Sequence, residues 1–185
     1  MSSSNLFRWS GLATILGGVL LPMSWVLRFV FGVQRPISGT VEFVGTILLV
    51  FGFMGVYGVQ HKETGILGFL GFLLVIIHKC SALGECWLQD GGDLTGVTVV
   101  LGPLVGVTML LGFILLGIGS WKANKLPRWT AVLWVIGGML IVPGFLVQPM
   151  LVVIGGVIQG TGFVGAGVKL WTSTNQPARQ AEAAI

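Results

Sequence analysis

Residues 130–171 read TAVLWVIGGMLIVPGFLVQPMLVVIGGVIQGTGFVGAGVKLW, and Lys169 is the one charged side chain among them. A helix needs roughly 20 apolar residues to cross the hydrocarbon core of a bilayer. The stretch contains two such segments, 130–147 and 150–171, separated by Gln148-Pro149. It therefore predicts two membrane-spanning helices joined by a very short turn.

The rest of the chain has the same pattern, with apolar segments separated by polar connections that read GVQRPISGT, QHKETG, LQDGGDLTG and WKANKLPRW. We predict an all-α integral membrane protein, a six-transmembrane-helix bundle forming one domain over residues 1–172. A polar cytoplasmic tail follows at 173–185. The predicted spans are 9–31, 41–59, 65–87, 97–120, 130–147 and 150–171.

The composition excludes a water-soluble domain. Of the 185 residues, 54% are hydrophobic and only 9% are charged, and the mean hydropathy is +0.95. Soluble domains carry about 25% charged residues, so this chain cannot cover a water-facing surface. The net charge of +4 comes from scattered residues and not from one basic face, which argues against a nucleic-acid partner.

Lys and Arg residues near the ends of spans predict the orientation, because such residues are retained in the cytoplasm. With six spans, three basic residues fall on one side: Arg28, Arg35 and Lys79. Seven fall on the other: Arg8, Lys62, Lys122, Lys125, Arg128, Lys169 and Arg179. We therefore predict a multi-pass protein of a bacterial-type plasma membrane with both termini in the cytoplasm.

An internal repeat is visible in the sequence. Arg8-Trp9-Ser10 and Gly17-Gly18 recur as Arg128-Trp129-Thr130 and Gly137-Gly138, at an offset of 120. Gly52-Phe53 recurs as Gly162-Phe163 at an offset of 110, and Gly112-Phe113 is related. The pattern predicts three parallel two-helix units packed through glycine-rich faces, since small residues let membrane helices approach closely. The alternative is chance similarity between glycine-rich apolar helices.

Four polar side chains gather toward the predicted outer ends of the spans: Arg28, Glu42, His78 and Lys79. Charged groups inside spans are costly, so they tend to pair or to mark function. One interpretation is an Arg28–Glu42 pair across the first hairpin, or Arg28 extending to the headgroups. The other interpretation is a polar ligand pocket formed by all four side chains.

Cys80 and Cys86 lie near the same outer end. A disulfide is one prediction, and it requires the helix to stop near Gly84, because bonded cysteines need Cα atoms within about 7 Å. Two unpaired cysteines packed in protein, or a redox-active pair, are the alternatives. The spacing with His78 matches no standard zinc pattern, so we predict no metal site.

No cofactor is predicted from the sequence. A bound lipid remains open, as does a pigment such as a haem or chlorophyll ligated by His78.

On the cytoplasmic side, Lys122, Lys125 and Arg128 stand beside Trp121 and Trp129. Tryptophan at the membrane interface is an ordinary anchor, and the basic cluster also suits anionic lipid.

The segment from Leu116-Gly117 through LPRWTAVLWVIGGML resembles a pattern in small, uncharacterised multi-pass membrane proteins of bacteria. In that pattern a span ends in Leu-Gly, a short basic loop follows, and Leu-Pro-Arg-Trp opens the next glycine-rich span. The resemblance covers about the last 75 residues and implies a six-helix bundle. It implies no activity and no functional residues.

The chain has no Gly-x-Ser-x-Gly, no His-Glu-x-x-His and no phosphate-binding loop, which argues against an enzyme. We expect a non-catalytic membrane protein: an accessory subunit of a larger complex, or a binder of a lipid or other apolar molecule. Its expected partners are membrane lipids and other membrane subunits or further copies of itself. The alternatives are a small transporter or substrate-capture component using the outer polar cluster, and a membrane thiol-redox protein.

Overall fold

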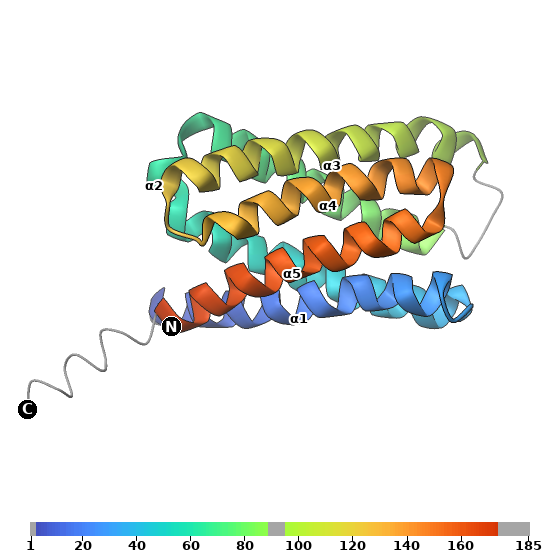
Figure 1. Ribbon diagram of the computed structural model, residues 1–185, viewed down its shortest axis with the longest axis horizontal. Coiled ribbons are helices and arrows are strands. Elements are labelled where there is room, and N and C mark those ends of the chain that lie inside the picture. Colours follow the sequence, from blue (N-terminus) through green and yellow to red (C-terminus); the bar gives the residue numbers. More distant parts are fainter. Residues whose placement is uncertain (1–2, 89–94, 174–185) are drawn as a thin grey trace, which may run out of the picture.

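The computed structural model describes residues 3–88 and 95–173, and the side chains of residues 5–84 and 102–173. In these parts of the chain the structure is all-α, and no residue forms a strand. The elements are α1 (Ser3–Phe29), α2 (Arg35–Leu88), α3 (Thr95–Ala123), α4 (Arg128–Val147) and α5 (Pro149–Ser173). Figure 1 shows them as long helices lying side by side along the longest axis of the molecule.

Each of the five described helices is long and apolar enough to cross a membrane, as expected for a membrane protein. The prediction of six separate helices is wrong in its count. The predicted spans 41–59 and 65–87 both lie in α2, which has 54 residues and one non-helical residue, Gly65, with φ 60° and ψ −160°. The predicted connection QHKETG is helical up to that glycine, because none of its side chains before Gly65 breaks a helix.

α2 turns back on itself at Gly65. The ring of Tyr57 stacks on that of Phe72, with 4.5 Å between centroids. In a straight helix, residues 15 positions apart would lie about 22 Å from each other. The contact therefore requires the segments 35–64 and 66–88 to run antiparallel, as the ribbon of α2 does in Figure 1. Positive φ combined with extended ψ is accessible almost only to glycine.

Proline defines the starts of three helices. Pro36 is the second residue of α2, Pro127 precedes α4, and Pro149 begins α5. Proline suits these positions because the N–H groups in the first turn of a helix have no partner within the helix. Gln148, in an extended conformation, is the single residue between α4 and α5. α5 continues to Ser173, and the rest of the predicted tail, 174–185, lies outside the described residues.

Glycines bring neighbouring helices close together. α1 packs against α2 and α5, α3 packs against α2 and α4, and α4 packs against α5. Where α4 meets α5, a Cβ added at Gly137 would lie 2.7 Å from the carbonyl oxygen of Gly155, and one at Gly155 would lie 2.8 Å from that of Gly137. A side chain larger than hydrogen at either position would therefore force the two helices apart.

Aromatic side chains fill the centre of the bundle. Phe53, Phe113, Phe163 and Trp134 are fully buried, and they come from α2, α3, α5 and α4 respectively. The three phenylalanine rings contact one another pairwise, with centroid separations of 5.3, 5.8 and 6.0 Å. These distances are typical of favourable aromatic pairs, so the centre is a packed core built from distant parts of the chain.

Candidate functional site

The structure places the predicted outer polar residues on α1 and on both halves of α2. The indole Nε1 of Trp25 donates a hydrogen bond of 3.2 Å to the Glu42 carboxylate, and the guanidinium of Arg28 lies 5.0 Å from the ring centroid of Phe29. Trp25 is thus a partner of Glu42 that the sequence reasoning missed. The predicted Arg28–Glu42 pair stays a prediction.

Lys79 and His78 are both buried, with 3% and 7% of their surfaces exposed. The Lys79 ammonium is near enough to Glu42 for electrostatic attraction, although the sequence placed it at the rim. His78 lies beside the backbone of Val105 in α3, and its Nδ1 has no hydrogen-bond partner among the described residues. Of the four predicted residues, Glu42 and Lys79 therefore lie together with Trp25. His78 lies beside α3 instead, and Arg28 lies over the ring of Phe29.

The cysteine prediction needs a correction. α2 continues through Gly84 to Leu88, so Cys80 and Cys86 lie on one uninterrupted helix. Their Cα atoms are about 9 Å apart, which exceeds the separation a disulfide allows. Cys80 is an exposed, free cysteine, and the side chain of Cys86 lies outside the described ones. A disulfide or a redox pair formed by these two residues does not fit this helix.

Metal ligands do not gather in the described part of the chain. No group of three His, Cys, Asp or Glu side chains there could hold a metal ion. Two of the acidic residues near the predicted outer end, Asp90 and Asp93, lie outside the described residues.

An apolar groove of about 350 Å³ lies between α3 and α4. These two helices pack less extensively than the other neighbouring pairs. Gly117 and Ala131 make room for the groove because their side chains are absent or small. We call it the α3–α4 groove; its lining residues are Gly117, Ile118, Trp121, Lys122, Ala131, Val132, Val135 and Ile136.

The rim of the α3–α4 groove is formed by aromatic and basic residues around the α3–α4 connection. Trp121 is 46% exposed, and the guanidinium of Arg128 lies over its ring, 5.5 Å from the centroid. Arg128 Nε also donates a 3.2 Å hydrogen bond to Asn124 Oδ1. Lys122 lines the groove and has no ion-pair partner among the described side chains. The groove itself is therefore apolar, and two basic residues, Lys122 and Arg128, lie near its Trp121 end.

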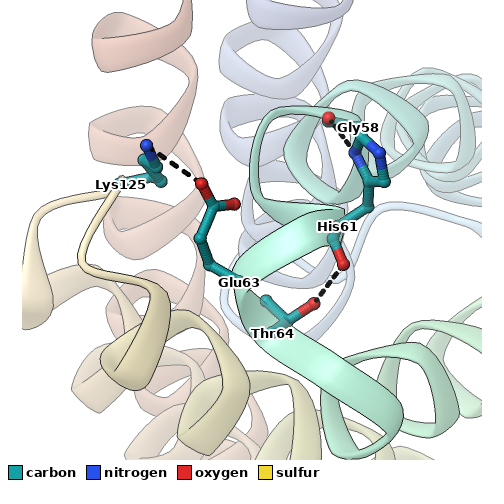
Figure 2. A network of polar contacts seen from close by, with 5 residues as sticks. All are labelled: Gly58, His61, Glu63, Thr64 and Lys125. Carbon is teal, nitrogen blue, oxygen red and sulfur yellow. Dashed lines mark hydrogen bonds and ion pairs between the residues drawn. The ribbon is translucent and has the colours of Figure 1, made fainter.

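A second polar network holds the same end of the bundle together (Figure 2). Lys125, in the α3–α4 connection, forms a 3.1 Å ion pair with Glu63, just before the turn of α2. Next to it, His61 Nδ1 is 2.7 Å from the carbonyl oxygen of Gly58, and Thr64 Oγ1 donates to the carbonyl oxygen of His61. The charge of Lys125 is thus already matched, unlike that of Lys122.

Sequence reasoning identified Trp121, Lys122 and Arg128 as interface residues but missed the groove. Two small residues facing each other across a short connection, Gly117 and Ala131, are the signal that could have indicated it. Comparison of the chain with protein-family models, curated proteins and solved structures found no match.

Proposed function

We propose that this chain is a non-catalytic, polytopic membrane protein that works by association and binds a membrane lipid in the α3–α4 groove. The observation that carries this proposal is the apolar groove of about 350 Å³ on the outside of the bundle, open between two membrane-spanning helices. Ligand sites are typically concave and mostly apolar with a few polar groups, and here the surrounding solvent is lipid.

The proposal includes the topology. Since α2 turns back at Gly65, five helices provide six crossings of a bacterial-type plasma membrane, with both termini in the cytoplasm. In this orientation the α3–α4 connection, with Lys122, Lys125 and Arg128, faces the cytoplasm, in agreement with the retention of basic residues there. Fusion of a reporter to Ile185 tests this arrangement: activity of a reporter that works only outside the cytoplasm would contradict it.

The proposal also includes the repeat of two-helix units. The aligned residues Phe53, Phe113 and Phe163 contact one another at the centre of the bundle, which supports three related units around one axis. Association with other membrane subunits or with a second copy remains part of the same proposal, because the apolar outer faces of the helices suit either a lipid or a protein neighbour.

Purification of the full chain in mild detergent, followed by native mass spectrometry, tests lipid binding. We expect a bound species with the mass of a phospholipid. Val132→Trp should abolish it, because Val132 lines the groove and is 38% exposed, so a larger ring fills the groove without disturbing the core. Val168→Trp is the matched control, since Val168 is 47% exposed on α5, away from the groove. Equal retention of lipid by both variants would contradict the proposal.

A second candidate function, a solute transporter or substrate-capture component, is favoured by the buried Lys79 near Glu42. A charged amine inside a span is rare and often functional. If this function is the correct one, Lys79→Met abolishes uptake of an anionic solute into vesicles while the variant remains folded. An uptake rate equal to that of the parent protein removes this candidate.

A further inference from the structure

We propose that the lipid in the α3–α4 groove is an anionic phospholipid of the cytoplasmic leaflet, with its headgroup phosphate bound by Lys122 and Arg128. This inference rests on the proposed lipid-binding function and specifies the class of its ligand. It combines two features of α3 and α4. One is the apolar α3–α4 groove between them, and the other is the pair of basic residues near one end of that groove, Lys122 and Arg128.

The apolar part of the groove fits a segment of one acyl chain. Ile118, Val132, Val135 and Ile136 form its walls, and residues 131–136 extend about 8 Å along the helix axis. Each methylene that enters such a groove contributes contacts that a loosely packed bilayer does not provide. A partner helix would instead need a contact along much of a roughly 30 Å hydrocarbon core, so the short groove favours a chain over a helix.

The cationic end of the groove fits a phosphate. Lys122 is in the last turn of α3, and Arg128 is the first residue of α4, so the four-residue connection brings both to the same end. The bond from Arg128 Nε to Asn124 uses one of five guanidinium donors, and the others remain for an acceptor. Arg and Lys are the usual ligands of phosphate oxygens in proteins.

The charge distribution selects an anionic headgroup. Lys125 is paired with Glu63 at 3.1 Å, so Lys122, which lines the groove, and Arg128, which lies over the Trp121 ring, are the nearby basic residues without an ion-pair partner among the described side chains. A zwitterionic headgroup such as phosphatidylcholine brings its own ammonium group to this rim, whereas phosphatidylglycerol carries none. Basic pockets between membrane helices on the cytoplasmic side are typical sites for anionic lipid. The indole of Trp121 also suits the headgroup level.

The test uses the full chain in nanodiscs made of phosphatidylcholine with increasing phosphatidylglycerol, and measures bound lipid by native mass spectrometry after release. We expect preferential retention of phosphatidylglycerol. Lys122→Gln and Arg128→Gln should each weaken this preference about fivefold. Lys169→Gln, which removes the same charge from an exposed position on α5 outside the groove, should leave it unchanged.

The outcomes separate this inference from the proposed function. If Val132→Trp removes bound lipid but the parent protein retains phosphatidylcholine and phosphatidylglycerol equally, the headgroup assignment is overturned and lipid binding stands. If all three charge variants weaken the preference equally, a diffuse surface charge is responsible and the assignment to Lys122 and Arg128 is again overturned. If no lipid is retained in any sample, both proposals fail.

Discussion

The ring of Phe53 packs edge to face against the ring of Phe163, with 5.3 Å between the centroids. The sequence repeat aligns these two residues at an offset of 110, and the related Phe113 contacts both of them. Equivalent residues meet in this way when related units surround a common axis. In the proposed repeat, these three phenylalanines are the equivalent residues of the three two-helix units.

The Phe53 contact predicts a large effect of truncation on stability. Phe53→Ala should lower the free energy of unfolding by about 3–5 kcal/mol, because it leaves a cavity among three aromatic neighbours. Phe51→Ala is the control, since Phe51 is on the same helix but 38% exposed. Equilibrium unfolding in detergent micelles measures both. Equal losses for the two variants would mean that the aromatic centre is not a packed core.

A buried polar contact between α2 and α3, about two helical turns from the aromatic core, predicts energetic coupling between these helices. Gln60 Nε2 donates a 2.8 Å hydrogen bond to Ser120 Oγ, and both residues are buried. Gln60→Leu and Ser120→Ala should each destabilise the fold, and the double variant should lose less than their sum. The expected coupling is about 0.6 kcal/mol, with about 1.7 kcal/mol as an upper value. A double-mutant cycle on the same unfolding assay measures it, and strict additivity would argue against the bond.

Two adjacent glycines of α4, Gly137 and Gly138, provide a matched pair of alanine substitutions. A Cβ at Gly137 would lie 2.7 Å from the Gly155 carbonyl oxygen, whereas one at Gly138 would meet no atom closer than 3.8 Å. Gly137→Ala should therefore cost about 1–3 kcal/mol in the free energy of unfolding by forcing α4 and α5 apart. Gly138→Ala should be neutral or stabilise by up to about 1 kcal/mol. Thermal unfolding monitored by circular dichroism compares the two, and similar transition temperatures would contradict the close approach.

The turn of α2 predicts a second glycine effect with a different cause. At Gly65 the φ of 60° and ψ of −160° suit glycine, so Gly65→Ala should destabilise the fold by about 1–3 kcal/mol through backbone strain. No neighbouring atom lies within 4 Å of the added Cβ, so crowding does not contribute. Gly84→Ala, also in open space but helical, should stabilise slightly. A stabilising Gly65→Ala would show that α2 does not turn at this residue.

Much of the helical architecture could be predicted from properties of short stretches of sequence. The extent of the apolar segments, and the position of the break at Gln148 before Pro149, follow from composition and from the geometry of proline. The continuity of α2 was missed, because Gln60, His61, Lys62 and Glu63 are polar in sequence yet accept helical geometry, and only Gly65 interrupts it. The same continuity, through Gly84, separates Cys80 from Cys86.

The sequence by itself determined that this chain forms apolar helices suited to a membrane, because the lack of charge and the length of each segment are properties of single stretches. Only the tertiary structure decided which faces meet. It placed Glu42 against Trp25, buried Lys79, brought three phenylalanines together and opened a groove beside Trp121 and Lys122. Each of these depends on the relative rotation and separation of two helices. The rotation and the separation of each helix pair result from the packing of many side chains and glycines at once. They cannot be read from any single stretch of sequence.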